Sequence, residues 1–388
     1  MRYRLLSAAP SAAIVAAMFA ASACDISVPL DAPAGDASDV TGDGVTAVCD
    51  GPGCPVALSI ALNADSSCVR MADRSVRCWG ALPDARLPRQ QVLLSDTAAL
   101  TLGDGYLCAL MPDASVRCYG DNSEGQLGDG TTVSRTVPTA VAALASATQV
   151  IAAGTTTCAV SVDHTAWCWG SNAHGQLGDS TTQGRRTPAQ VPGLVNVARL
   201  AMNRETVCAV LADATVRCWG EGFATVPTAV PGLSGVADMT VGAAHYCALL
   251  ADRGVRCWGA NAYGQLGDGT TATRTVPAAV NGLAGVVRVV AGATHTCAVT
   301  GDGTVRCWGQ NDVGQLGDGT TVDHVTPFRV QSIDQVVDLG VGLAAGPGSG
   351  HACVVRRDGS AWCWGHNMYG QLGDGATMYR TTAGRVVF

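Results

Sequence analysis

Cysteine is the residue type with the clearest chemistry in this chain, because the sequence holds 17 Cys among 388 residues. Fourteen of them form seven pairs whose members lie ten positions apart. These pairs are Cys68 and Cys78, Cys108 and Cys118, Cys158 and Cys168, Cys208 and Cys218, Cys247 and Cys257, Cys297 and Cys307, and Cys353 and Cys363. Structural zinc sites space their cysteines only about two to four residues apart, and so many cysteines are typical of an oxidising compartment. We therefore predict seven disulfides, no metal centre and no cofactor.

The three remaining cysteines precede these pairs. Cys49 and Cys54 bracket Asp-Gly-Pro-Gly, a turn sequence, and we expect them to close a small disulfide loop. Cys24 follows an apolar, Ala-rich stretch behind a short cationic head, which indicates a signal peptide at residues 1–23. The preceding Ala-Ser-Ala is either an ordinary cleavage site or part of a string that resembles a bacterial lipobox. We favour lipidation of Cys24, because its removal leaves an even number of cysteines to pair.

Residues 24–55 are predicted to form a disordered acidic tether. They carry several Asp, Pro and Gly, but no aromatic and no basic residue, so they cannot bury enough apolar surface to order themselves. With the signal peptide and the lipid, this segment predicts an exported protein. We expect it to be anchored in the membrane of a bacterial cell envelope, at the outer membrane or cell surface, or else to be secreted.

The paired cysteines must be positioned by β-strands. In residues 286–330, short runs at 286–290, 295–300 and 304–309 are separated by Gly-rich turns, and a fourth run begins near Pro327. The cysteine pairs recur every 39–56 residues, and each second Cys is followed by Trp-Gly or Tyr-Gly. Four short strands per unit at this period indicate propeller blades. We predict an all-β, seven-bladed propeller over residues 56–388.

The strand register follows from the position of the hairpin turn. If the chain turns about Asp302, Cys297 lies opposite Cys307, and directly opposed residues are about 4.5–5.5 Å apart, which suits a disulfide. An Asp stands at the same midpoint in all seven units. The last run, 382–388, is expected to pair with the N-terminal strands and so close the ring, with an open solenoid as the alternative.

The units resemble the repeat of the regulator of chromosome condensation family. That repeat carries Asn-x-x-Gly-Gln-Leu-Gly-x-Gly after its Trp-Gly or Tyr-Gly, and here the string stands at residues 122–130, 261–269, 311–319 and 367–375. Residues 172–180 match except for Ser180, and the first and fourth units lack the string. The resemblance implies a seven-bladed propeller. The cysteine pairs depart from it and are interpreted as an adaptation to life outside the cytoplasm.

One ring of residues is our candidate binding site. The residue before the second Cys of each unit is Arg77, Arg117, Trp167, Arg217, Arg256, Arg306 or Trp362. These side chains would lie at one structural level of the ring. They either pack on neighbouring blades through cation–π contacts, which we favour, or line a recognition surface, since Arg and Trp are common at interface hot spots.

Other polar sets have simpler structural explanations. His245, His295 and His351 share one position in the unit and could converge on a metal, but the other units hold Ser, Tyr or Thr there, which favours packing. The loop carboxylates Asp129, Asp179, Asp268, Asp318 and Asp374 could bind calcium, but each precedes Gly or Ser in a turn. An insertion at residues 343–350 is either a contact loop or a tolerated extension. No Ser-His-Asp or Cys-His set recurs, so we expect no catalysis.

Composition narrows the function further. The chain has no Lys and a net charge of −7, so it offers no P-loop lysine and no basic tail for nucleic acid. We expect a non-catalytic propeller that binds another macromolecule, with a protein favoured, through blade-connecting loops. A glycan or cell-wall polysaccharide is the alternative partner. Guanine-nucleotide exchange on a small GTPase is implied by the family resemblance alone and is not carried over, because fold does not imply function.

Overall fold

The computed structural model describes residues 26–27, 46–47, 56–81, 89–91, 94–144, 146–343 and 350–388. All regular elements in these residues are strands, and none is a helix long and apolar enough to cross a membrane. β1 (Ile26–Ser27) and β2 (Thr46–Ala47) form a two-residue antiparallel pair within the predicted tether. The signal peptide, Cys24, Cys49 and Cys54 lie outside the described residues, so what we expect of them stays a prediction.

The remaining strands form seven four-stranded antiparallel sheets. From the innermost strand outward, the first four blades are β3 (Ala57–Leu62), β4 (Ser66–Met71), β5 (Val76–Gly80) and β6 (Arg89–Gln91); β7 (Ala99–Leu102), β8 (Tyr106–Leu110), β9 (Val116–Gly120) and β10 (Arg135–Ala140); β11 (Ala147–Ala153), β12 (Thr156–Ser161), β13 (Ala166–Gly170) and β14 (Arg185–Gln190); and β15 (Val197–Met202), β16 (Thr206–Leu211), β17 (Val216–Gly220) and β18 (Thr228–Ala229).

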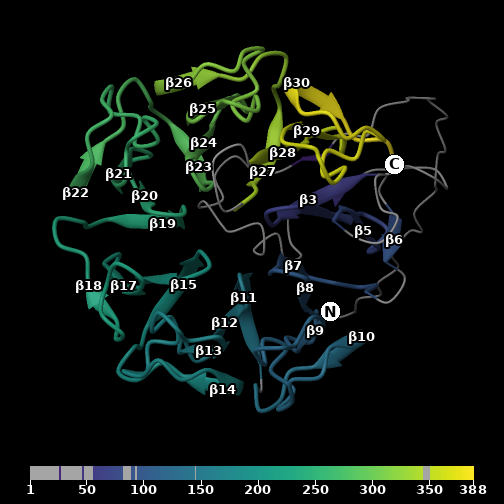
Figure 1. Cartoon of the computed structure of the whole chain (residues 1–388), viewed down its shortest axis with the longest axis vertical. Helices are drawn as coiled ribbons and strands as arrows, with labels where there is room; N and C mark the ends of the chain where they lie inside the picture. Colours follow the sequence, from purple (N-terminus) through teal and green to yellow (C-terminus); the bar gives the residue numbers. More distant parts are fainter. Residues whose placement is uncertain are drawn as a thin grey trace, which may run out of the picture.

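The last three blades repeat this order. They are β19 (Val236–Val241), β20 (His245–Leu250), β21 (Val255–Gly259) and β22 (Arg274–Ala279); β23 (Val286–Ala291), β24 (His295–Thr300), β25 (Val305–Gly309) and β26 (His324–Arg329); and β27 (Val336–Val341), β28 (His351–Arg356), β29 (Ala361–Gly365) and β30 (Arg380–Arg385). The blades stand around a central channel lined by the innermost strands (Figure 1). The predicted all-β, seven-bladed propeller is therefore confirmed.

Each blade has a covalent link between its second and third strands. In all seven blades the two paired cysteines are directly opposed in the strand register, with Cα atoms 4.0–4.1 Å apart, and are joined by a disulfide. These are the seven pairs that the ten-residue spacing predicted. Each of these cysteines is at most 1% exposed, so the disulfides belong to the core between blades rather than to the surface.

Ring closure differs from the expectation. The C-terminal strand β30 pairs with β29 and completes the seventh blade, whereas the first blade obtains its outer strand from β6. The prediction of a blade shared between the two ends of the chain was wrong, because the first unit supplies its own fourth strand. β3 instead contacts β27 and β28 of the seventh blade.

One side-chain bond and one backbone bond close this seam. The Ile60 N–H donates to a carboxylate oxygen of Asp338 at 2.8 Å, and the Ala57 N–H donates to the Gly359 carbonyl at 3.0 Å. Asp338 also lies 3.2 Å from the Arg288 guanidinium and is 3% exposed. A similar arrangement occurs elsewhere at the channel, where the side-chain amide of Gln149 donates to the Leu200 carbonyl and accepts a hydrogen bond from the Leu200 N–H. Buried edge groups thereby find partners without a continuous sheet.

Replacing Asp338 with Ala should lower the free energy of unfolding by about 2–4 kcal/mol. The change leaves the buried Ile60 N–H without this acceptor and removes a carboxylate from beside Arg288. Urea unfolding of the purified protein measures the loss. Asp334→Ala is the control, because Asp334 is 56% exposed and its pair with Arg356 should contribute less than about 1 kcal/mol. If both variants lose equally little, Asp338 does not hold the seam.

Candidate binding surface

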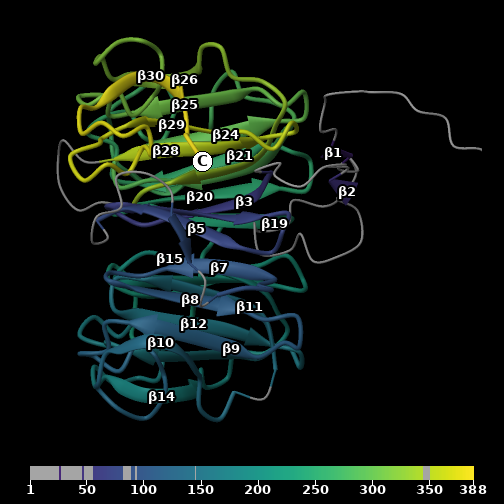
Figure 2. The same cartoon turned by 90° about the vertical axis from the view of Figure 1, so that its right-hand side faces the viewer.

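The antiparallel order gives the propeller two different faces. The strands run roughly along the ring axis, so their ends gather on opposite sides (Figure 2). We call one side the loop face; it carries the long loops between the third and fourth strands, such as residues 122–134. We call the other the hairpin face; it carries the tight turns between the second and third strands, such as residues 301–304, and the connections between blades.

The Asn-x-x-Gly-Gln-Leu-Gly string folds the long loop onto itself. The Asn122 amide nitrogen lies within hydrogen-bond distance of the carbonyls of Thr131 and Val133, and its oxygen accepts the Leu127 N–H at 2.9 Å. Asn172, Asn261, Asn311 and Asn367 make the same contacts in their loops. Each of these asparagines is at most 1% exposed, so the amide works as an internal brace.

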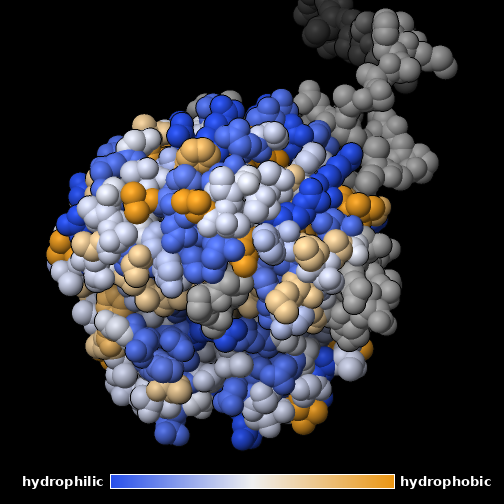
Figure 3. Space-filling model, turned by 45° about the horizontal axis from the view of Figure 1, so that its top comes forward, coloured by the Kyte–Doolittle hydropathy of each residue, from blue (hydrophilic) through white to orange (hydrophobic). Residues whose placement is uncertain are grey.

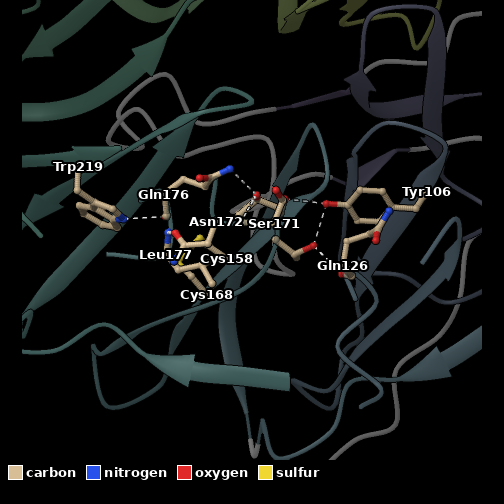
Figure 4. The surroundings of a disulfide bond; sticks show 11 residues. Tyr106, Gln126, Cys158, Cys168, Ser171, Asn172, Gln176, Leu177 and Trp219 are labelled. Atoms are coloured by element: carbon tan, nitrogen blue, oxygen red, sulfur yellow. Dashed lines mark hydrogen bonds between the residues drawn. A yellow bond between two sulfur atoms is a disulfide. The ribbon is translucent and has the colours of Figure 1, made fainter. Parts of the chain in front are cut away.

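The same loop also joins one blade to the next. The indole N–H of Trp219 donates to the backbone carbonyl of Gln176 in the preceding blade at 2.9 Å (Figure 4). Equivalent bonds run from Trp79 to Gln371, Trp169 to Gln126, Trp308 to Gln265 and Trp364 to Gln315, at 2.7–3.0 Å. Gly178 beside this contact has φ +71°, and a Cβ there would lie 2.8 Å from the indole nitrogen. The Asn-x-x-Gly-Gln-Leu-Gly loop therefore links each of these blades to the next one.

The two blade interfaces without the string use other residues. The first unit lacks it, and the following blade carries Tyr119 in place of Trp. The fourth unit also lacks it, and Trp258 of the next blade stacks on Tyr246, whose ring is met edge-on by Phe223 of the fourth blade. Where the carbonyl acceptor is missing, aromatic packing takes its place.

The loop carboxylates have internal partners. Asp129 accepts hydrogen bonds from the Thr131 N–H and hydroxyl and pairs with Arg135 at 2.6 Å. Asp179, Asp268, Asp318 and Asp374 pair in the same way with Arg185, Arg274, His324 and Arg380. Among the described residues no group of three His, Cys, Asp or Glu side chains is placed to hold a metal ion. The geometry supports the turn interpretation of these carboxylates.

The three histidines of the repeat are buried between blades. A ring nitrogen of His245 lies 2.9 Å from the Thr296 hydroxyl, and one of His351 lies 2.8 Å from the Ser67 hydroxyl. Tyr106 makes the corresponding contact with Thr157 at 2.9 Å. His295 is the exception: neither ring nitrogen has a hydrogen-bond partner among the described residues, because Ala352 stands where the other blades provide a hydroxyl.

Burial keeps these histidines neutral. Desolvation lowers the pKa of His245 and His351 to about 3 and the pKa of His295 to about 4. Because these values lie below the value of about 6.5 in an unfolded chain, the unfolded state binds more protons below that pH. The stability contributed by the neutral rings is present above about pH 6.5 and is lost as the pH falls towards 4.

The variant His245→Tyr should flatten this pH dependence. Tyr106 shows that the site accepts a phenol beside a threonine hydroxyl, so the replacement keeps the contact with Thr296 and removes one titrating group. The slope of the unfolding free energy between pH 6 and pH 4 should decrease by up to about 1.4 kcal/mol per pH unit. Chemical unfolding at several pH values measures it. Parallel curves for wild type and variant would show that His245 does not titrate on unfolding.

The predicted Arg and Trp ring lies on the third strands, towards the hairpin face. Its two tryptophans donate to hydroxyls of the adjacent turns, Trp167 to Thr165 and Trp362 to Ser360, both at 2.9 Å. Arg77 lies over the Phe388 ring, 5.7 Å from its centroid. Arg117, Arg217 and Arg256 are exposed and Arg306 is half-buried. Some members of the ring therefore pack and others face solvent, and the interpretation of the exposed members as a recognition surface stays a prediction.

Arginines of both faces form ion pairs, but several on the hairpin face do not. Arg204 pairs with Asp104 at 2.7 Å on the loop side, and Arg74 with Asp96 and Arg356 with Asp334 pair on the hairpin face. On the hairpin face the turn aspartates are used locally; Asp113, for example, accepts from the Ser115 N–H and hydroxyl. Side-chain hydrogen bonds and ion pairs to Arg117, Arg217, Arg253, Arg256, Arg306, Arg329 and Arg385 are absent among the described residues. Sequence reasoning missed Arg253, Arg329 and Arg385, which lie outside the position before the second Cys.

Apolar side chains do not dominate the visible surface, where they are scattered among polar ones (Figure 3). The large exposed apolar residues of the seventh loop, Met368, Tyr369, Met378 and Tyr379, are 50–73% exposed. The insertion at residues 343–350 begins with Leu343, which lines the channel, and residues 344–349 lie outside the described part. The role of that insertion remains a prediction.

Comparisons with known proteins agree with this geometry. The chain belongs to the family described as the RCC1-like domain, whose model matches residues 83–387. No curated protein sequence matches it. Similar solved structures include Prp20p from Saccharomyces cerevisiae (20% identity, TM-score 0.70, 84% of this chain and 86% of that chain) and human WBSCR16 (22%, 0.67, 77% and 86%). The CRINKLY WD40 ectodomain of the Arabidopsis thaliana receptor kinase ACR4 is also similar (19%, 0.52, 85% and 98%).

Proposed function

We propose that this protein is an exported, envelope-anchored propeller that binds another protein through its hairpin face and catalyses nothing. The observation that carries the proposal is the set of arginines on that face that have no ion pair among the described residues. Arginine and tryptophan are enriched among residues that dominate protein–protein binding. A guanidinium without an internal carboxylate is available for a partner, whereas one already paired is not.

The division of labour between the faces supports this choice. The loop face uses its repeated polar groups to fasten blades together, as the Asn braces and Trp–Gln bonds show. The hairpin face includes the connections between blades, and several of its glycines, such as Gly282 and Gly285, have open space where a Cβ would stand. Binding residues are commonly found on such connecting segments, which a rigid scaffold holds in place.

The relatives offer a precedent for protein binding. Binding properties to Gsp1p and histones are described for Prp20p. We extend to this chain only the general use of a propeller surface to hold a protein. An exchange role on a GTPase rests on family analogy alone and forms no part of the proposal.

Export and anchoring rest on separate features. Seven disulfides favour an oxidising compartment outside the cytoplasm. The proposed signal peptide at residues 1–23, the lipid on Cys24 and the tether at 24–55 precede Val56, which lies beside Gly359 at the hairpin face. A lipid at Cys24 would therefore hold the propeller by the side of the ring that carries the unpaired arginines.

A capture experiment tests the binding proposal. Immobilised mature protein should retain a partner from a solubilised envelope fraction, and a variant in which Arg117, Arg217, Arg256 and Arg306 are all changed to Gln should retain about tenfold less of it, because the unpaired guanidinium groups are expected to dominate binding. Arg186→Gln is the control, because Arg186 is an exposed arginine of β14 outside the hairpin face. Retention of the protein on cell-wall polysaccharide, with no protein captured, would favour the glycan alternative and overturn the proposal.

The lipid is tested separately by Cys24→Ser in the producing cell. The substitution should abolish incorporation of labelled fatty acid and release the protein from the membrane fraction, because the thioether carrying the lipid can no longer form. Cys49→Ser serves as the matched cysteine control and should keep the label. Labelling that survives in Cys24→Ser would leave only an ordinary cleavage site before residue 24.

A further inference from the structure

A hollow on the hairpin face lies at the junction of the fifth and sixth blades. It has a volume of about 400 Å³ and is lined by the glycine-rich connection at residues 282–285, by the turn at 300–302 and by Arg253 and Arg306. A Cβ added to Gly282 or Gly285 would meet no atom within 4 Å, so the rim is open. We call this site the arginine hollow.

Two blades contribute cations to this site. Arg253 belongs to the turn of the fifth blade, and its guanidinium lies 3.8 Å from the position that a Cβ on Gly301 of the sixth blade would take. Arg306 on β25 is directly opposed by Arg329 on β26, so the two side chains share one face of the sheet. Like charges in directly opposed positions destabilise a sheet, which makes this pair unfavourable in the absence of an anion.

The nearby carboxylate is engaged in its own turn. One oxygen of Asp302 accepts from the Thr300 hydroxyl at 2.7 Å and from the Thr304 N–H and hydroxyl at 3.1 and 2.9 Å. Among the described residues, neither it nor any other carboxylate forms an ion pair with Arg253, Arg306 or Arg329. The hollow thus holds two guanidinium groups, Arg253 and Arg306, beside one carboxylate that is already hydrogen-bonded, and Arg329 is the register partner of Arg306.

The equivalent hollow elsewhere in the ring lacks this charge. At the junction of the third and fourth blades a hollow of about 410 Å³ contains Arg217 and Asp213 as its charged residues. Arg217 on β17 is opposed by Ala229 on β18, whereas Arg306 on β25 is opposed by Arg329 on β26. The hollow at the fifth and sixth blades therefore carries one arginine more than the hollow at the third and fourth.

We propose that the arginine hollow binds the carboxylate side chains of an acidic segment of a protein partner. Guanidinium groups pair with carboxylates through two parallel hydrogen bonds, and two of them at one hollow select a short acidic stretch. An extended polyanion fits less well, because every blade places an aspartate in its hairpin turn and the polymer would meet Asp252 and Asp302 on either side of the hollow. The inference rests on the proposed protein-binding function and names the partner's chemistry.

The test uses a fluorescent peptide of eight glutamates and the mature protein. Fluorescence anisotropy at low salt should show binding that Arg306→Gln and Arg253→Gln each weaken by about tenfold, because each variant removes one charge-assisted pair. Arg217→Gln, in the equivalent hollow, should change it less than about twofold, and a peptide of eight glutamines should not bind. Thermal unfolding of the same variants checks that they fold, which the surface position of these residues leads us to expect.

Three results would overturn the assignment. The first is that Arg306→Gln and Arg253→Gln bind the peptide as well as wild type does. The second is that Arg217→Gln weakens peptide binding equally. The third is that a sulfated polysaccharide or anionic phospholipid vesicles bind more tightly than the peptide through the same two arginines. The proposed function is judged separately. If wild type and Arg306→Gln capture a partner equally well, only the proposal for the arginine hollow is overturned. If the peptide binds but no partner is captured, only the wider proposed function is overturned.

Discussion

The constraint on which this structure depends is that every blade must satisfy the exposed backbone and polar groups of its neighbour. Seven separate sheets share no continuous ladder, so the junctions between them combine single backbone hydrogen bonds, such as that from Val197 to His164, with side-chain contacts. Indole N–H groups donate to glutamine carbonyls near the loop face, hydroxyls meet His or Tyr rings deeper inside, and Gln149 and Asp338 bind free strand edges at the channel. Buried polar groups are costly when unpaired, and this requirement explains why so many repeated positions are polar yet buried.

The disulfides act at a different level. Each one joins two strands inside a single blade and makes no covalent link between blades, so it supports the hairpin that carries the turn and the residue before the second Cys. The long loops of one face join blades, whereas several arginines on the other face have no ion pair among the described residues. This difference is the reason for proposing the hairpin face as the binding surface.

Much of this could be predicted from the sequence, and the limits have physical reasons. The ten-residue spacing and the Asp at each turn determine a hairpin register, so the disulfides and the blade count follow from local pattern. Closure was mispredicted because β6 is only three residues long and carries no recognisable run. The role of the glutamines was not visible either, since the acceptor is a backbone carbonyl. Arg253 reaches the site of Arg306 from the neighbouring fifth blade, and Arg329 lies opposite Arg306 on the next strand. A position-by-position comparison of the repeats does not reveal either relation.

The seam between the first and seventh blades has a mechanical consequence. The chain enters the ring at Val56, next to Gly359 and a few residues from the bond between Ile60 and Asp338. A pull on the N-terminal side of Val56 is therefore transmitted first to β3 and to the junction between the first and seventh blades. Such a load therefore acts on this seam, while the disulfide in each blade keeps its second and third strands covalently joined.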